Sequence, residues 1–125
     1  MNDFNYTTEG GNATITGYTG TGGAVTVPST LGGCPVTTIG RGAFSGSKVT
    51  IVTLPNSVTT IEHAAFCDCK QLWSMTFAME LNIIGDYAFD GCVSLWRFRW
   101  PTALKSIGEF AFRRCGSPEF NIITI

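Results

Sequence analysis

The sequence predicts a β-rich solenoid of about four coils, each 22–23 residues long, with an N-terminal β-hairpin cap and short helical turns. A nine-residue segment recurs four times at nearly constant spacing, and a short alternating strand precedes the later copies. Such self-similarity is typical of a solenoid, in which each unit buries its apolar face against its neighbours. Hydrophobic residues make up 44% of the chain and charged residues only 14%, so we expect a packed core and not a disordered chain.

The recurring segment begins with Ile, carries an Ala-Phe pair on an expected short turn of helix, and ends with Cys or Ser. Its copies are residues 39–47, 61–69, 84–92 and 107–115, and their first residues lie 22, 23 and 23 positions apart. We expect the four Phe side chains, Phe44, Phe66, Phe89 and Phe112, to form one buried aromatic column. In the last position, Cys69, Cys92 and Cys115 should form a ladder of reduced, buried thiols, because free Cys packs as a small hydrophobic residue.

Glycine follows the first Ile in three of the four copies. Gly40, Gly85 and Gly108 occupy this position, which indicates a backbone conformation with positive φ. Glu62 stands there in the second copy, so the requirement is not absolute.

Short strands with alternating side chains lie between these segments. Val52 and Leu54, Met75 and Phe77, and Phe98 and Trp100 are spaced two apart and should face the core, because strand side chains alternate between the two faces. The residues between them should face solvent. Those outward residues form the first candidate site.

The domain organisation is a tail followed by one repeat domain. We expect residues 1–11 to be a flexible tail and residues 12–125 a single domain, with a hairpin cap at about 12–28 and repeats at about 24–115. Residues 120–125 read as a final strand. An uncovered apolar edge is a template for pairing, so residues 121–125 predict an edge-to-edge homodimer.

The repeat resembles that of BspA-like leucine-rich repeat proteins, also called the Treponema pallidum type. Val52-Thr53-Leu54-Pro55-Asn56-Ser57-Val58-Thr59-Thr60-Ile61 is its best representative, and the resemblance covers about residues 12–115. It implies an α/β leucine-rich repeat solenoid that is curved, with a parallel sheet on one face. It also implies a non-enzymatic role as a surface adhesin or protein-interaction module.

Two successive strands carry the candidate binding residues. They are Trp73, Ser74, Thr76, Trp96, Arg97 and Arg99. Trp and Arg dominate protein-binding hot spots, because each combines apolar area with a directed polar group. The alternative is that the Trp side chains pack on the flank and the Arg side chains are only solvated.

Basic residues are concentrated near the C-terminus. Residues 97–114 contain five basic residues and one acidic residue, although the whole chain has a net charge of −1. A protein partner is expected, and an acidic protein or an anionic glycan would fit this charge. Nothing in the sequence indicates nucleic acid specifically.

Metal binding and catalysis receive little support. His63, Cys67, Cys69 and Cys92 suggest zinc, but His-x3-Cys-x-Cys is not a usual zinc spacing and Cys69 should point inward. The single His has no recognisable triad partners, and no phosphate-binding loop is present. We therefore expect no enzyme, no cofactor and no metal.

The sequence thus predicts a binding module that presents the outward strand residues to a macromolecular partner. A small intracellular inhibitor or regulator of a protein target, and a structural segment of a longer repeat stalk, are the alternatives. No apolar run is long enough to span a membrane, and residues 1–6 do not read as a signal peptide. A removed signal would place the protein at the cell surface or outside the cell, and its absence would place it in the cytoplasm.

Overall fold

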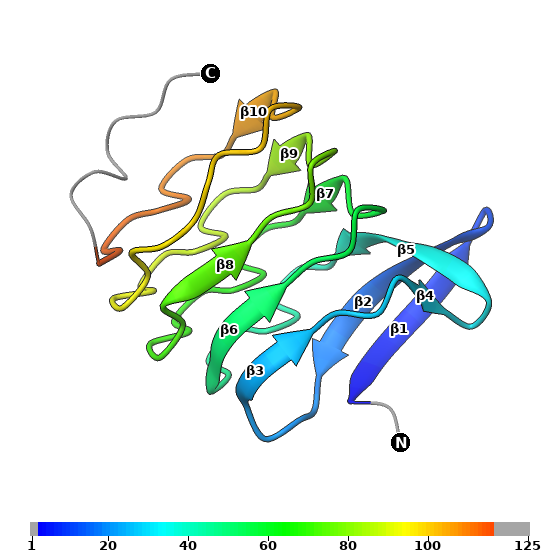
Figure 1. The fold of residues 1–125 in the computed structure, drawn as a ribbon, viewed down its shortest axis with the longest axis horizontal. Helices are drawn as coiled ribbons and strands as arrows, with labels where there is room; N and C mark the ends of the chain where they lie inside the picture. The colour runs from blue at the N-terminus through cyan, green and yellow to red at the C-terminus, as the bar shows by residue number, and fades with distance from the viewer. Residues whose placement is uncertain (1–2, 117–125) are drawn as a thin grey trace.

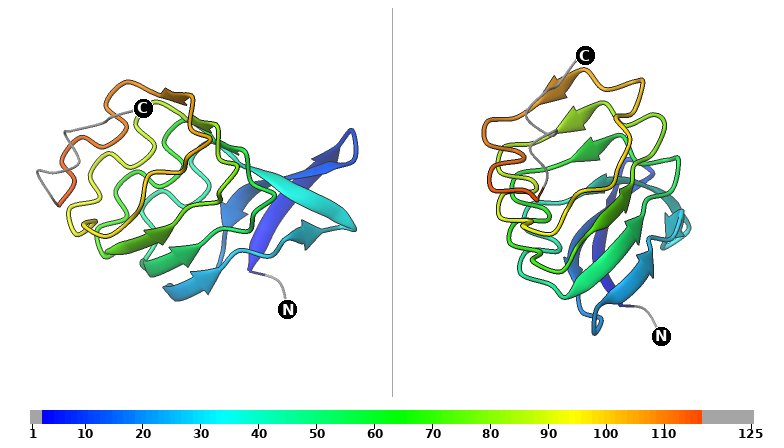
Figure 2. Two further views of the ribbon diagram at one scale, coloured as in Figure 1. Left: turned by 45° about the horizontal axis from the view of Figure 1, so that its top comes forward. Right: turned by 60° about the vertical axis from the view of Figure 1, so that its left-hand side comes forward.

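The structure is a computed structural model that describes residues 3–116, and it is a solenoid of stacked coils (Figure 1). One sheet has the order β1 (Phe4–Glu9), β2 (Asn12–Tyr18), β5 (Cys34–Ile39), β7 (Thr60–Ile61), β9 (Ile83–Ile84) and β10 (Ser106–Ile107), and β4 (Thr30–Leu31) pairs with β5. The second sheet has the order β3 (Gly23–Thr26), β6 (Val49–Thr53) and β8 (Ser74–Thr76). Figure 2 shows the two sheets on different sides of the same stack of coils. The predicted solenoid is confirmed.

Equivalent residues of successive coils are in register. Ile39 pairs with Ile61, which pairs with Ile84, which pairs with Ile107, and all of these strand pairs are parallel. Neighbouring strands in a sheet lie about 4.8 Å apart. Each position of the repeat therefore becomes a row of side chains that runs along the solenoid axis.

The four repeat phenylalanines form the predicted column inside the solenoid. The rings of Phe44 and Phe66 lie 4.7 Å apart between centroids, those of Phe66 and Phe89 5.0 Å, and those of Phe89 and Phe112 5.1 Å, with interplanar angles of 14°, 3° and 5°. Phe44, Phe66 and Phe89 are almost completely buried. The column is the continuous part of a core to which every coil contributes.

A thiol ladder lies beside the aromatic column, as the sequence predicts. The thiols of Cys69 and Cys92 donate hydrogen bonds to the carbonyls of Phe44 and Phe66, each at 3.0 Å, and Cys115 donates to Phe89 at 3.2 Å. Each thiol thus ties one coil to the coil before it. Burial raises the pKa of Cys115 to about 12, so this sulfur stays protonated at neutral pH.

The third side of each coil is made of turns, where the sequence predicts short helical turns. The described residues contain no helix. The amide of Phe66 donates to the carbonyl of Ala88 in the next coil at 2.7 Å, and Phe44 donates to Ala65 in the same way. Because these amides are used between coils, they cannot close the successive bonds of a helix.

The prediction of positive φ for the glycine after the first Ile is wrong. Each copy has two left-handed residues, two and six positions further along. The first row is Gly42, Ala64, Tyr87 and Phe110, and the second row is Gly46, Asp68, Gly91 and Arg114. Gly40 is needed for close approach instead, because a Cβ there would lie 2.6 Å from the carbonyl oxygen of Ile15. A Cβ at Gly85 or Gly108 would likewise lie too close to backbone atoms of the preceding coil.

The N-terminal cap also differs from the expected one. Residues 4–9, which the sequence places in a flexible tail, form β1 and pair antiparallel with β2. The hairpin is therefore β1–β2, and β3 belongs to the other sheet. Tyr18 stacks on Phe44 at 5.1 Å, and Phe4 meets Phe44 edge-on at 6.2 Å, so the cap closes the aromatic column. The predicted final strand, residues 120–125, lies outside the described residues.

Candidate functional site

The outward side of the second sheet, which we call the strand face, carries the predicted binding residues. Its pairings align Ile51 with Ser74 and Thr53 with Thr76, and Arg97 continues the first row by a parallel bridge to Ser74. Arg99 is exposed two residues beyond Arg97, while its neighbours Phe98 and Trp100 pack against the core. Residues 98–100 form no strand, so the strand that the sequence predicts in the fourth coil is reduced to this one bridge. The residues of the face are Ala24, Thr26, Thr50, Ile51, Thr53, Trp73, Ser74, Thr76, Trp96, Arg97 and Arg99.

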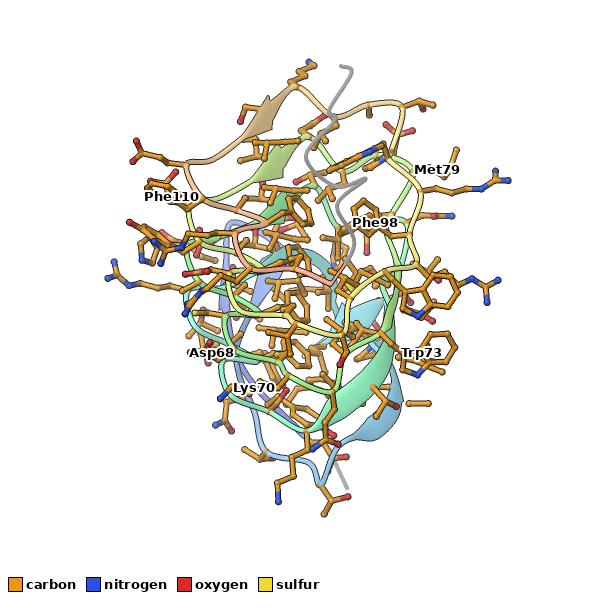
Figure 3. The ribbon with its side chains drawn as sticks, turned by 90° about the vertical axis from the view of Figure 1, so that its left-hand side faces the viewer. Asp68, Lys70, Trp73, Met79, Phe98 and Phe110 are labelled. Atoms are coloured by element: carbon orange, nitrogen blue, oxygen red, sulfur yellow. The ribbon has the colours of Figure 1, made fainter. Side chains whose placement is uncertain are left out.

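Two tryptophans stack at one end of this face, Trp73 directly before β8 and Trp96 at the equivalent position of the last coil. The rings of Trp73 and Trp96 lie 6.1 Å apart with an interplanar angle of 18°. Trp96 is 57% exposed, whereas Trp73 is partly covered. Figure 3 shows Trp73 and Met79 on one edge of the solenoid, opposite Phe110. The structure therefore brings together the two tryptophans predicted from adjacent repeats.

The strand face has uncompensated positive charge. Arg97 and Arg99 are both exposed, and neither forms an ion pair with any residue in the described range 3–116. None of the outward positions of β3, β6 or β8 holds an acidic residue. An anionic group of a partner would thus meet two arginines with no carboxylate to displace.

The two arginines on the turn side of the last coil are neutralised in part. Both Arg113 and Arg114 bind the carboxylate of Asp90, at 2.8 and 3.1 Å. The hydrogen bond from Arg113 lowers the pKa of Asp90 below its ordinary value, and Arg114 adds to this. The positive segment 97–114 is therefore divided into a free pair on the strand face, a paired group on the turn side, and Lys105, which is exposed and forms no ion pair within residues 3–116.

A second cluster on the turn side was not predicted from the sequence. The ring of Tyr87 lies 5.5 Å from that of His63 and 5.6 Å from that of Phe110. The guanidinium of Arg113 lies 4.9 Å from the centroid of the Phe110 ring and 5.5 Å from that of Tyr87. The sequence does contain a signal for this cluster: one repeat position holds Gly42 and Ala64 in the first two copies, and Tyr87 and Phe110 in the last two.

The zinc candidates do not converge. Within residues 3–116, no three His, Cys, Asp or Glu side chains are grouped so that they could hold a metal ion. Cys69 and Cys92 point inward at carbonyl groups, while His63 faces Tyr87. In the same range, no helix is long and apolar enough to cross a membrane.

An open hollow of about 520 Å³ lies beside the N-terminal cap. Its lining includes Tyr18, Phe44 and Lys48, and the hydroxyl of Tyr18 accepts a hydrogen bond from the amide of Gly22 at 2.9 Å. Among residues 3–116, Lys48 is the only charged residue of the lining, which also holds the hydroxyl groups of Thr21, Ser45 and Ser47. No His, Asp or Glu of the same range lines the hollow, so these hydroxyl groups are not part of a Ser-His-Asp arrangement there.

The periodic rows and the two sheets agree with what comparison with protein families finds. Residues 37–124 match the BspA type leucine rich repeat region, in six copies. The chain belongs to the BspA-type leucine-rich repeat family. A leucine-rich repeat of this kind is generally a protein-interaction module, so the predicted class of function is supported at that level.

Solved structures with the same fold include three bacterial leucine-rich repeat proteins. The T. pallidum protein is 30% identical with a TM-score of 0.72, over 89% of this chain and 64% of its own. One from Bacteroides ovatus is 31% identical with a TM-score of 0.81, over 92% of this chain and 32% of its own. One from Bacteroides capillosus is 28% identical with a TM-score of 0.81, over 90% and 88%.

This chain thus spans somewhat under two thirds of the T. pallidum protein and about one third of the B. ovatus protein. A search of curated proteins finds no match.

Proposed function

We propose that this protein is a non-enzymatic binding module whose strand face holds a protein partner. The observation that carries the proposal is the pair of exposed arginines, Arg97 and Arg99, beside the stacked tryptophans Trp73 and Trp96. Exposed Trp and Arg are enriched at binding hot spots. Ser74 and Thr76, on β8, add hydroxyl groups between β6 and the segment that carries the arginines.

The charge of the face favours a partner with carboxylates. The two arginines are two residues apart in the chain, so their Cα atoms are separated by at most about 7 Å. Alternate side chains of an extended acidic segment have the same spacing. A guanidinium also binds a carboxylate through two parallel hydrogen bonds. An anionic glycan would also neutralise the two arginines, but the spacing of its acidic groups is not set by an extended peptide backbone.

The setting that we propose is the outside of a cell, where the module would act as an adhesin on a matrix or host-cell protein. The same face could serve an intracellular regulator, and the location of the full-length gene product distinguishes the two. A location in the cytoplasm would exclude the adhesin role and leave the binding face unaffected.

The experiment compares partners of the wild type with those of Arg97→Ser/Arg99→Thr. These substitutions install the residues that the preceding coil carries in the same rows, Ser74 and Thr76, so we expect the fold to accept them. The immobilised proteins are exposed to a cell-surface extract and retained proteins are identified by mass spectrometry. Loss of the main partner at least about tenfold is expected, since two hot-spot charges are removed.

A charge-matched control is Arg41→Gln/Lys105→Asn, which also removes two positive charges but leaves the strand face intact. Both side chains are exposed and neither forms an ion pair within residues 3–116. This control should retain the partner. If both variants behave alike, net charge and not the strand face determines binding, and the proposal is wrong.

A further inference from the structure

The outward side of the turn segments, residues 40–47, 62–69, 85–92 and 108–115, forms a second exposed surface, which we call the turn face. Figure 3 shows it at the edge marked by Phe110, opposite the edge marked by Trp73. In the first two coils the first of the two left-handed positions holds Gly42 and Ala64, and in the last two it holds Tyr87 and Phe110. The aromatic residues therefore make a raised apolar patch on one half of this face.

Phe110 occupies a conformation that suits it poorly. Its φ is +58°, in the left-handed region that a bulky side chain rarely adopts. It is also 48% exposed. The Phe110 side chain is thus only partly buried. Gly, which the first coil has at this position, would adopt the same backbone conformation without strain. A bulky residue held in such a place is a reason to look for a contact that covers it.

Arg113 is fixed beside this patch. Its Nε and Nη2 atoms donate to the two carboxylate oxygens of Asp90, at 3.2 and 2.8 Å, and its guanidinium lies over the rings of Tyr87 and Phe110. Arg114 donates to the same carboxylate at 3.1 Å. Asp90 is buried, while the two arginines remain about half exposed. Two held guanidinium groups share the carboxylate of Asp90, and the exposed Asp68 lies two coils earlier in the row of Arg114. The net positive charge of this flank is therefore confined to the last two coils.

The opposite flank of the patch is negative. Asp86 and Glu109 precede Tyr87 and Phe110 in their coils, and both are exposed. Asp86 accepts a hydrogen bond from the amide of Glu109 at 2.8 Å, which holds its carboxylate at the surface. In the last two coils, the order across the face is therefore acidic residues, aromatic residues and basic residues.

This order is self-complementary. A two-fold axis through the aromatic patch places the acidic flank of one copy over the basic flank of the other, and the rings of both copies against one another. We propose that the turn face is the interface of a homodimer in which two copies of this chain pack back to back. A purely anionic partner would instead meet the repulsion of Asp86 and Glu109.

The dimer should be weak. Four coils at about 4.8 Å span roughly 20 Å along the axis, so the contact is small compared with a stable interface of about 800 Å² per partner. A contact of this size belongs with weak, transient encounters. Because the charged flanks are exposed, the association should weaken as salt is added.

Back-to-back packing leaves both strand faces free on the two outer sides of the dimer. If the strand face binds its partner as proposed above, each dimer would bind two partner molecules. A surface that carries many copies of the partner would then bind the dimer more tightly than it binds a monomer. The dimer itself does not depend on that proposal.

The test is sedimentation equilibrium of the full chain from about 5 to 500 μM, a range wide enough to detect a weak dimer. Wild type should form dimers. Phe110→Gly restores the residue of the first coil and should weaken dimerisation at least about tenfold, because it removes a central hot-spot ring. Its thermal midpoint should stay within about 3 °C of wild type, since relief of the strained φ offsets the lost ring contacts.

Two further variants keep the proposal open to refutation. Glu109→Arg introduces the residue type that the first coil has at the same position, Arg41. It should also weaken the dimer, because the new arginine would face Arg113 of the other copy. Trp96→Thr removes an equally exposed aromatic ring from the opposite side, restores the residue type of Thr50, and should leave dimerisation unchanged.

Three results would overturn the proposal. They are a monomer at every concentration, a dimer that only Trp96→Thr weakens, and a dimer that Ile123→Pro abolishes while Phe110→Gly does not. The last result would assign the contact to the edge at residues 121–125. A variant that loses dimerisation but still binds the partner, or one that loses the partner but still dimerises, would show that the two surfaces act independently.

Discussion

Replacing Phe89 by Ala should remove the largest single contribution to the stability of the aromatic column. The ring is completely buried and lies between Phe66 and Phe112, at 5.0 and 5.1 Å, with Phe77 packed edge-on at 5.7 Å. Its neighbours are held in their own coils by hydrogen bonds between coils, so they cannot close the space. A buried Phe→Ala substitution costs about 3–5 kcal/mol, and the rigid surroundings place this one in the upper part of that range.

The measurement is urea denaturation followed by far-ultraviolet circular dichroism, together with a thermal melt. For a domain of this size, the loss corresponds to a fall in the midpoint of roughly 10–20 °C. Phe110→Ala is the matched control, because it removes an exposed ring one coil away, at a position where Ala64 already accepts the same backbone conformation. It should cost less than about 1 kcal/mol. A loss of that size for Phe89→Ala, or equal losses for both variants, would refute the stacked column.

Three further predictions concern other parts of the solenoid. Asp90→Asn should lower the free energy of unfolding at pH 7, because it removes the carboxylate that both arginines bind. Since Arg113 lowers the pKa of Asp90, the difference in stability from wild type should be complete above about pH 4 and should disappear as the pH falls through the lowered pKa. Denaturation at pH 7 and at pH 2.5 would measure this difference. A thiol reagent at pH 8 should modify Cys34 and Cys67 before Cys69 and Cys92, which are buried and hydrogen-bonded; equal rates for all four, measured by mass spectrometry, would contradict the ladder. Gly85→Ala should destabilise the protein by more than about 1 kcal/mol, because its Cβ would lie 2.8 Å from the backbone of Glu62 and His63, whereas Gly46→Ala, with open space around it but a positive φ, should lose only the cost of that conformation.

The strand face shows what sequence reasoning could and could not reach. The rows that join Ser74 to Arg97 and Trp73 to Trp96 follow from the repeat length, because parallel coils bring equivalent residues together. The pairing of Arg113 and Arg114 with Asp90 does not follow from it, since it depends on side-chain rotamers at the turn. The sequence therefore shows a positive C-terminal segment but not which of its charges remain free.

The turn side shows the same division. The sequence predicts a helical turn there, since Ala-Phe between polar residues has that appearance. In the structure, amides such as that of Phe66 bind the next coil instead. For the same reason, the glycine after the first Ile serves close approach between coils, a distance that no single repeat reveals.

What the sequence alone determined is the period, and with it the solenoid, the buried phenylalanine and cysteine rows, and the strand face. These follow because a repeat of constant length can bury its apolar side only against its own copies. What the tertiary structure decided is the pairing at the two N-terminal strands, the backbone conformation of the turns, and the separation of free from neutralised arginines. Each of these depends on which donor, acceptor or ring a residue meets in the neighbouring coil.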